Sequence, residues 1–367
     1  GALCKGRRRD QCAADMAEDN AEVEKKLDQP DVVTKYKDAA GIANAALKAV
    51  LAKLVAGASV VEVCNAGDDY VNKAVEKVYT KPVTVKDEKT GADKKKPMDK
   101  GLAFPTCISP NACVAHYSPL STEDSTLNDG DIVTVELGCH IDGFIAVAAT
   151  TTAVGSTPGV PPQISGRAAN AMMAAWVAAE ASLRLLRPGH TSQEITNVIN
   201  RAAEQFKCTP LDGVLSHQMK QHVIDGNSVI LSRPTVEQRV DLVTFEKNEV
   251  YAIDIAISTG EGRAREQASR ATVFKRRPDV EYQLKMPTAR KVLSEISAKG
   301  ADLPFCLRSL EDEKKAKLGV TELITHGLVV HYPVLYEKED EFVARICYTA
   351  LIMPSQTIPI TEYLKPD

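Results

Sequence analysis

One pattern occurs twice along this chain, and it constrains the fold more than any other feature. In the first half a helical stretch ends at a glycine, and Ser59 is followed by Glu62 at the start of a second helical stretch. In the second half Thr191 and Glu194 repeat this arrangement after a Pro-Gly pair. A Ser or Thr with a carboxylate three residues later is typical of a capping box at a helix N-terminus.

The strand-like segments that follow these helices also match. Residues 131–136 (DIVTVE) align with residues 249–254 (EVYAID), and each segment ends in a carboxylate, Glu136 in the first and Asp254 in the second. The repetition predicts two similar units, each with two helices and a sheet, with the sheets joined at the centre and the helices outside. The expected fold class is therefore α+β, with two pseudo-symmetric αα-plus-sheet halves.

The rest of the chain fits around this duplication. Residues 1–30 are charged and lack hydrophobic periodicity, so we expect them to be disordered and residues 31–360 to form a single domain. Residues 81–100 are polar and Lys-rich, which indicates a loop or a short hairpin arm. The second half carries an additional charge-rich block at about 263–335, helical in its middle, which we interpret as an inserted subdomain.

Composition excludes several classes of protein. The formal net charge is -4, so the whole chain is not a general polyanion binder, and any nucleic-acid surface must be a local patch. No apolar run approaches the roughly 18 residues of a membrane span, so no membrane partner is expected. The cysteines are scattered without a Cys-x-x-Cys pair, which favours buried thiols in a reduced intracellular compartment.

A candidate pocket lies at the centre of the duplication. Side chains alternate along a strand, so Glu136 and Asp254 each share a face with mainly small neighbours. A histidine also precedes each carboxylate strand, His116 in the first half and His217 in the second. This pattern predicts two inward-facing carboxylates with two histidines. The alternative is a pair of solvent-facing carboxylates with structural histidines.

Several of these stretches resemble a type 2 methionine aminopeptidase. They are residues 103–106 (AFPT), 115–119 (AHYSP), 136–138 (ELG) and 250–254 (VYAID). That family has the pita-bread fold, and the block at 263–335 is similar to the helical insertion that marks type 2. The resemblance extends over about residues 30–355. It implies a site for two metal ions that hold the water nucleophile and the substrate carbonyl.

The resemblance also implies where the metal ligands and catalytic histidines of that family fall. One catalytic histidine is retained as His116, but the second falls on Asp225. The positions of the bridging carboxylates fall on Val147 and Cys347, and a valine cannot bind a metal ion. The vestigial pocket is expected to hold no metal and no cofactor, and its residues are His116, Glu136, Val147, His217, Asp225, Asp254 and Cys347.

The residues also leave open an alternative in which the protein is a catalytically active enzyme. A mononuclear site on Glu136, His217 and Asp254, with or without Cys347 as a further ligand, would make the protein a divergent metallo-aminopeptidase. Relative to the metal ligands of that family, position 136 has Glu in place of Asp and position 254 has Asp in place of Glu. Each exchange displaces the carboxylate by one methylene. Metal sites tolerate little displacement, so the pattern favours a non-catalytic protein.

Longer strings resemble a narrower family, the proliferation-associated and curved-DNA-binding proteins, which includes the ErbB-receptor-binding protein of animals. These strings are residues 215–226 (LSHQMKQHVIDG), 258–262 (STGEG), 311–316 (EDEKKA) and 334–338 (VLYEK). The resemblance implies a non-peptidase that binds rRNA or curved DNA and associates with the large ribosomal subunit. It also implies a monomer in the nucleus, nucleolus and cytoplasm, with roles in ribosome biogenesis, translation or growth regulation.

Two further points bear on the partners. The Lys-rich C-terminal tail of the animal members has no counterpart in the residues up to Asp367, which leaves tail-dependent functions in doubt. As an alternative function, the old substrate pocket would hold a peptide end and make the chain a protein-binding adaptor.

The charge pattern supports a nucleic-acid surface independently. Residues 263–291 contain nine basic and three acidic side chains, an excess of six positive charges that suits phosphate binding. The alternative is a solvated face of the insert. A weaker basic cluster lies in the arm, where nearby acids offset it. The candidate nucleic-acid-binding residues are Arg263, Arg265, Arg270, Lys275, Arg276, Arg277, Lys285, Arg290, Lys291, Lys94, Lys95 and Lys96.

Overall fold

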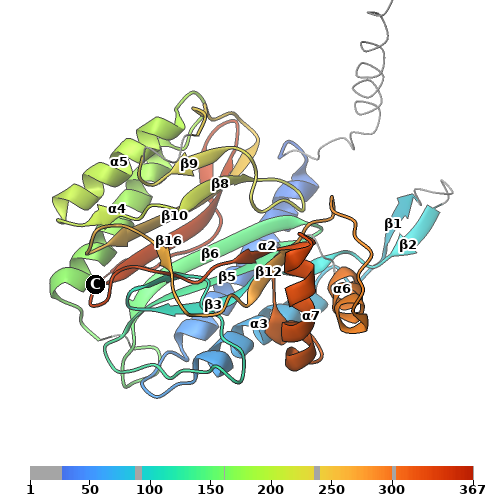
Figure 1. Cartoon of the computed structure of the whole chain (residues 1–367). Coiled ribbons are helices and arrows are strands. Elements are labelled where there is room, and N and C mark those ends of the chain that lie inside the picture. Colours follow the sequence, from blue (N-terminus) through green and yellow to red (C-terminus); the bar gives the residue numbers. More distant parts are fainter. Residues whose placement is uncertain (1–26, 87–92, 161, 235–239, 300–302, 367) are drawn as a thin grey trace, which may run out of the picture.

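An antiparallel sheet forms the centre of the molecule (Figure 1). The computed structural model describes residues 27–86, 93–160, 162–234, 240–299 and 303–366, and within these residues the central sheet has nine strands. The main path follows β3 (Lys100–Pro110), β5 (Ile132–Ile141), β6 (Phe144–Ala153), β16 (Val343–Ile352), β10 (Glu249–Ser258), β8 (Leu215–Met219) and β9 (Val229–Leu231), with β7 (Thr209–Pro210) beside β10 and β17 (Thr357–Pro359) beside β16.

The sheet consists of two similar halves, as the duplication predicts. In the first half α2 (Pro30–Leu51) packs on β5 and β6, and α3 (Val60–Glu76) packs on β3. In the second half α4 (Gly166–Leu185) packs on β16 and β10, and α5 (Ser192–Gln205) packs on α4 and β9. The halves join where β6 pairs with β16. Figure 1 shows both helix pairs on the outside of the sheet. The predicted architecture is therefore confirmed.

The two helix starts that revealed the duplication are capped differently. At α5, the Thr191 backbone N–H donates to Glu194 at 2.7 Å, and a complete capping box forms. At α3, Ser59 accepts from the Glu62 backbone N–H at 3.1 Å, but its own hydroxyl donates to Asp124 at 2.6 Å. The predicted box is thus only half present at α3, because a carboxylate from a distant loop takes part in the cap.

The start of the domain differs from the prediction. Residues 1–26, most of the segment that we expected to be disordered, lie outside the described residues. Leu27 is only 3% exposed, and α2 begins at Pro30, so the last residues of that segment belong to the folded domain. Proline suits the first turn of a helix because its φ angle is already helical and its missing N–H would have no partner there.

Two hairpins belong to the first half. Asp142 and Gly143 join β5 to β6 with φ angles of 56° and 75°, the backbone of a type I′ turn. Strands β1 (Val83–Lys86) and β2 (Asp93–Lys96) pair to form an arm that projects from the body in Figure 1. The hairpin interpretation of residues 81–100 is therefore correct, although residues 87–92 lie outside the described residues.

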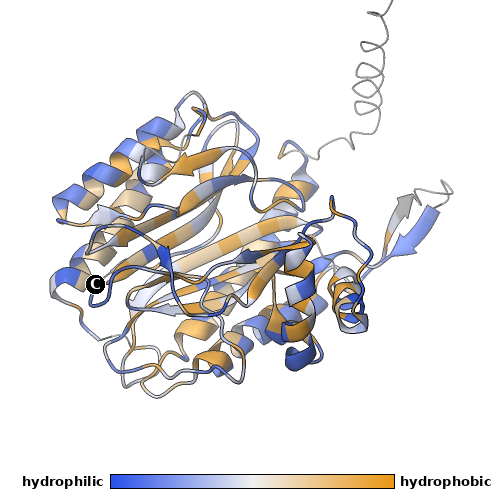
Figure 2. Ribbon diagram, viewed as in Figure 1, coloured by the Kyte–Doolittle hydropathy of each residue, from blue (hydrophilic) through white to orange (hydrophobic). Residues whose placement is uncertain are grey.

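Hydrophobic residues run along the central strands in Figure 2, and the two faces of β10 have different roles. Tyr251, Ile253 and Ile255 are buried against α4, whose facing residues include a row of fully buried alanines that lets the helix lie close to the sheet. The opposite face carries Val250, Ala252 and Asp254, as the period-2 pattern predicts. This second face looks toward the insert and contains the candidate pocket.

The insert has a small core of its own. Helix α6 (Pro287–Ala298) packs on α7 (Glu313–Thr325) through residues such as Val292 and Leu323. The short elements around these helices are β11 (Arg265–Glu266), β12 (Val273–Arg276), β13 (Phe305–Cys306), the 3₁₀ turn η1 (Leu307–Ser309), β14 (Val329–Tyr332) and β15 (Leu335–Tyr336), and β15 pairs with β4 (Cys113–Ala115) of the first half.

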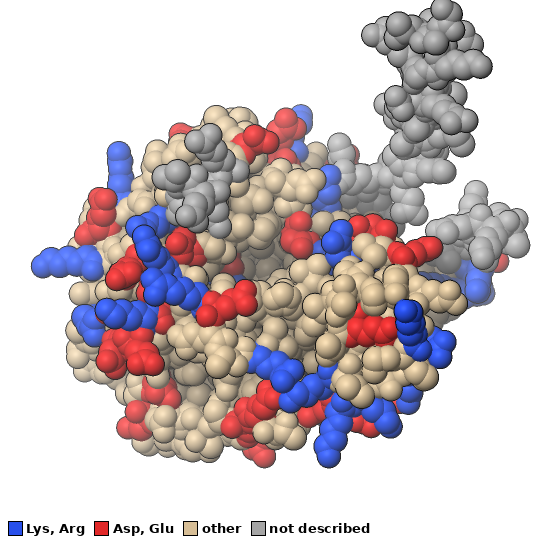
Figure 3. Space-filling view, viewed as in Figure 1, with Lys and Arg blue, Asp and Glu red and all other residues tan. Residues whose placement is uncertain are grey.

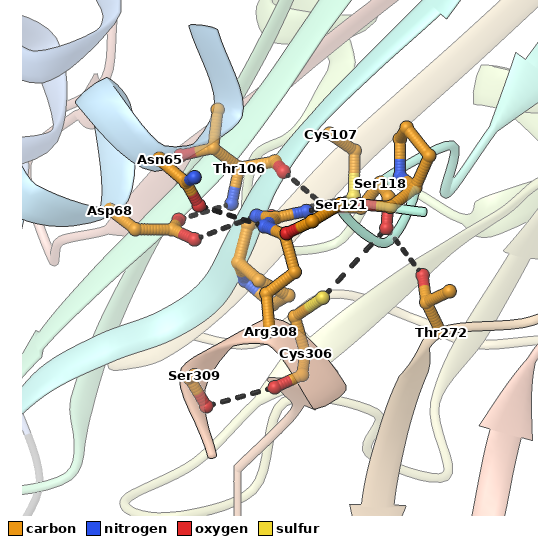
Figure 4. Close-up of polar contacts among 12 residues, drawn as sticks. Asn65, Asp68, Thr106, Cys107, Ser118, Ser121, Thr272, Cys306, Arg308 and Ser309 are labelled. Atoms are coloured by element: carbon orange, nitrogen blue, oxygen red, sulfur yellow. Dashed lines mark hydrogen bonds and ion pairs between the residues drawn. The ribbon is translucent and has the colours of Figure 1, made fainter. Parts of the chain in front are cut away.

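A buried arginine of the insert, Arg308, contacts the first half (Figure 4). Arg308 contacts Asp68 on α3 at 3.0 Å and Asn65 on the same helix at 2.9 Å. It also donates to the Ser118 hydroxyl at 2.7 Å and to the Pro119 carbonyl at 3.1 Å. Only 3% of the Arg308 side chain is exposed. A cleft of about 470 Å³ opens beside it, between α3, β3 and the insert.

Two further expectations concern the whole chain. The cysteines in the described part of the chain, Cys64 to Cys347, are all free and buried, which agrees with the expected reduced thiols. None of the described helices combines the length and apolarity that spanning a bilayer requires.

Candidate functional site

Two acidic side chains and one arginine meet where the two halves join. Glu136 lies on β5 of the first half, and Asp254 lies on β10 of the second half. Arg345 lies on β16, the strand between β10 and β6. Cys347 stands directly opposite Asp254 in the strand register, and Arg345 is two residues away on the same face. The arginine therefore extends into the space between the two carboxylates.

The guanidinium of Arg345 binds both carboxylates in a forked arrangement. Its two terminal nitrogens each lie 2.7 Å from an oxygen of Glu136. Its Nε lies 2.8 Å from one oxygen of Asp254, and Nη2 lies 2.6 Å from the other. All four carboxylate oxygens are thus engaged by one cation. Arg345 is 5% exposed, and the carboxylates are 10% and 13% exposed, so these are buried, charge-assisted hydrogen bonds.

The charges of this cluster are mutually dependent. Burial alone would raise the pKa of Glu136, but the neighbouring Arg345 outweighs it and holds that pKa below its usual value. Burial would lower the pKa of Arg345, and the carboxylates of Asp254 and Glu136 instead raise it well above its usual value. Glu136 and Arg345 are therefore charged at neutral pH, since each charge stabilises the other.

A small cavity of about 160 Å³ lies in front of the cluster. All of the residues predicted for the vestigial pocket contribute to its lining, and so do apolar side chains such as Phe104 and Leu335. The volume is below the roughly 300 Å³ at which pockets for drug-sized ligands begin. The complete predicted set that lines the cavity is His116, Glu136, Val147, His217, Asp225, Asp254 and Cys347.

The two histidines are neutral wall residues of this cavity. Nδ1 of His116 lies 2.9 Å from the Pro333 carbonyl, which can only accept, so this nitrogen carries the hydrogen. The His116 ring packs edge-on against Tyr332 at 5.3 Å. Burial lowers the pKa of His116 and also that of His217, whose Nδ1 is buried without a hydrogen-bond partner.

The residues present do not fit a pair of metal ions. The carboxylates that would have to bind metal are fully engaged by Arg345, which cannot lose its proton in a protein. Val147 offers no ligand atom, and burial raises the pKa of the Cys347 thiol well above its usual value, which opposes the thiolate form that binds metal. Across the residues that the structure describes, no three His, Cys, Asp or Glu side chains are arranged to hold a metal ion.

Asp225 plays a different part from the one that its position in the family suggests. It lies at the rim of the cavity, is exposed, and forms an ion pair with Lys275 of the insert. Arg345 is the residue that sequence reasoning missed. Its signal was present, because Arg345 alternates with Cys347 on one strand and so had to face the same pocket.

The predicted basic patch is divided by ion pairs. Five of its cations have acidic partners within 4 Å among the described residues, and these are Arg265, Arg270, Lys275, Arg277 and Lys291. Four of the five partners are acids outside residues 263–291, and they offset much of the positive charge expected there. In Figure 3 acidic and basic side chains are interspersed over the visible face.

The remaining predicted cations have no acidic partner among the described residues. On the second half and the insert these are Arg263, Arg276, Lys285 and Arg290, and on the β1–β2 arm they are Lys94, Lys95 and Lys96. Arg276 and the exposed Tyr282 line one open hollow of about 530 Å³. Tyr282 stacks on His326, with ring centroids 3.7 Å apart and planes 14° apart. Neither ring was identified as a candidate from the sequence.

The fold and the site together define a class of protein. Two αα-plus-sheet halves share one sheet, and a carboxylate from each half faces a common centre, which is the pita-bread arrangement of the methionine aminopeptidases. The Thermotoga maritima methionine aminopeptidase structure has the same fold, with a TM-score of 0.58 at 17% identity over 91% of this chain and 98% of that one.

Comparisons with known proteins identify the family. The model of metallopeptidase family M24 matches residues 34–270. ErbB-3 binding protein 1 of Arabidopsis thaliana is 44% identical over 351 residues, which are 95% of this chain and 85% of the relative. The curved DNA-binding protein of Schizosaccharomyces pombe is 34% identical over 94% of this chain and 88% of its own length. The structure of a thermophilic Arx1 matches with a TM-score of 0.83 at 28% identity, covering 92% of each chain.

The chain belongs to metallopeptidase family M24 and, within it, to the branch of the proliferation-associated and curved-DNA-binding proteins.

Proposed function

We propose that this protein is a non-catalytic M24 member that binds nucleic acid, either rRNA or curved DNA. In this proposal it associates with the large ribosomal subunit and acts in ribosome biogenesis, translation or growth regulation, in the nucleus, nucleolus and cytoplasm. The observation that carries the non-catalytic part is the contact of Arg345 with both Glu136 and Asp254. A peptidase of this family needs those carboxylates for metal, and here they are engaged by a fixed cation.

The mononuclear aminopeptidase is less well supported by this geometry. It would need Glu136, His217 and Asp254 to converge on one ion, and Arg345 stands between two of them. The peptide-binding adaptor is also less favoured, because the cavity of about 160 Å³ is smaller than pockets that bury a drug-sized ligand.

The surface of the insert supports a nucleic-acid partner. Arg276, Lys285 and Arg290 have no acidic partner among the described residues, so their charge is available to phosphates. The stacked and exposed Tyr282–His326 pair adds an aromatic surface of the kind on which unpaired bases stack. The name of the Schizosaccharomyces pombe relative, a curved DNA-binding protein, agrees with this kind of partner.

Co-sedimentation of the purified chain with large ribosomal subunits across a salt series tests the proposal. We expect binding that weakens with salt, and we expect Arg276→Glu/Lys285→Glu to weaken it further while lowering the salt slope by about two. Arg187→Glu/Arg201→Glu is the matched control, because it makes the same charge change on exposed arginines of the second half. Equal binding by both variants, or no binding at low salt, would contradict the proposed surface.

A further inference from the structure

The position of Arg345 assigns it a role beyond blocking a site. We propose that its guanidinium replaces the metal ions of the catalytic members as the cation that holds the two halves of the pita-bread sheet together. The domain would then need no divalent metal for its stability. This inference deepens the non-catalytic part of the proposed function, and it does not depend on nucleic-acid binding.

The two buried carboxylates of the cluster come from different halves of the sheet. Glu136 belongs to the first half and Asp254 to the second, and both are almost fully buried. Two carboxylates that face each other in a water-poor interior repel and lose their hydration, so they need a cation between them. Arg345 provides that cation on β16, the strand through which the second half pairs with the first.

The hydrogen-bond donors of the guanidinium match the acceptors of the two carboxylates. A guanidinium has donors in a planar fork, and that of Arg345 reaches all four oxygens of the two carboxylates at 2.6–2.8 Å. A lysine ammonium is a point charge and lacks this geometry. The fork therefore fixes the direction of both carboxylates as well as balancing their charge.

The other basic side chains around this cavity do not bind the two carboxylates. Nδ1 of His116 is directed at the Pro333 carbonyl at 2.9 Å, and Nδ1 of His217 is buried without a hydrogen-bond partner, so neither nitrogen binds a carboxylate of the cluster. Lys275, on the insert, is paired with Asp225 at the rim. Of the described residues that line the cavity, Arg345 is the only arginine or lysine.

Removing Arg345 should convert the cluster into a metal-responsive site. In Arg345→Gln, Glu136 and Asp254 lose their cation, and His217 with its unpartnered Nδ1 lines the same cavity. Carboxylate oxygens and imidazole suit divalent ions such as Mn²⁺. Thermal unfolding should show the wild type unchanged by Mn²⁺ or a chelator. Arg345→Gln should melt about 5 °C lower or more, and Mn²⁺ should restore part of that loss.

A variant without the three charges tests whether the loss of stability comes from charge or from side-chain shape. Glu136→Gln/Asp254→Asn/Arg345→Gln removes all three charges, so it should recover stability relative to Arg345→Gln and give no response to Mn²⁺. If Arg345→Gln is not recovered folded, refolding it with and without Mn²⁺ gives the same comparison. The inference is overturned if Arg345→Gln is as stable as the wild type, or if it is destabilised and gains no Mn²⁺ response.

The two proposals fail in distinguishable ways. Release of methionine from a peptide by the wild type, together with chelator-sensitive Mn²⁺ binding, would contradict the non-catalytic function itself. An inactive, metal-free wild type whose Arg345→Gln variant ignores Mn²⁺ would contradict only the role of Arg345 as the replacement cation.

Discussion

At the scale of single residues, the charge balance of the core decides what the central site does. Arg345 lies between Glu136 and Asp254 and binds both, and Arg345 stays buried because it has two carboxylate partners. Each of the three would be costly to bury alone. Evolution of the two-metal site of the catalytic members at this position would therefore require a change at Arg345 as well as new ligands at positions 147 and 347.

This view predicts that restoring the missing carboxylates is not enough. In Val147→Asp/Cys347→Glu we expect no bound metal and no release of methionine, because Arg345 still occupies Glu136 and Asp254. Two new buried carboxylates should also lower the free energy of unfolding by several kcal/mol. Elemental analysis and a methionine-peptide assay provide the measurement.

The control for this prediction is Val147→Asp/Cys347→Glu combined with Arg345→Gln. That triple variant should gain metal, since the guanidinium no longer competes for the carboxylates. Stoichiometric metal in the double variant with Arg345 intact would show that the arginine is displaceable and would contradict the prediction.

At the scale of elements, the insert packs around its own core, and its contacts with the rest of the domain include a buried charged joint at Arg308. Its helices α6 and α7 have their own hydrophobic core, and Arg308 of η1 links them to Asp68 and Asn65 on α3 (Figure 4). The same arginine binds Ser118 and Pro119 of the first half. The direction in which the insert presents its surface therefore depends on this joint.

Replacement of Arg308 with Ala should loosen the insert more than the sheet. Asp68 would be left buried without its cation, which typically costs about 3–5 kcal/mol. Amide hydrogen exchange should accelerate in α6 and α7 and change little in β5 and β10. The control is Lys291→Ala, which removes an exposed pair with Glu311 at 3.1 Å and should leave exchange near the wild-type rate. Uniform acceleration throughout the chain would argue against a local joint.

At the scale of the whole molecule, function depends on which charges remain free after folding. The sequence offers nine cations in residues 263–291, but five of them form ion pairs in the folded chain. Because the net charge is -4, the proposed nucleic-acid binding would depend on local groups of unpaired cations. The β1–β2 arm and the surface around Arg276 are such groups.

The salt dependence of binding to double-stranded DNA measures how many cations take part. If the four unpaired cations of residues 263–291 make the phosphate contacts, the slope of log K against log salt should be about -4. If all nine took part, the slope would be about -8. Titrations between 50 and 200 mM salt, repeated on Arg276→Glu/Lys285→Glu, distinguish the two outcomes. A slope near -8 would mean that the ion pairs open on binding.

The sequence by itself determined the architecture and most of the pocket. Hydrophobic periodicity and capping signals are local, so the repeated helix starts at Ser59 and Thr191 and the matching strands were enough to predict two halves around one sheet. Strand alternation then oriented Glu136 and Asp254 inward, and the histidine ahead of each strand pointed to His116 and His217. The resemblance added Val147, Asp225 and Cys347, and all of these residues line the cavity.

Only the tertiary structure decided which charged and aromatic groups meet. Arg345 and Glu136 are 209 residues apart, Arg308 and Asp68 are 240 apart, and Tyr282 meets His326 from another element. The partner of a long side chain depends on how distant strands and helices pack, and no local period encodes that. For this reason the sequence indicated that a metal site was incomplete, while the fold identified the arginine that stands between its carboxylates.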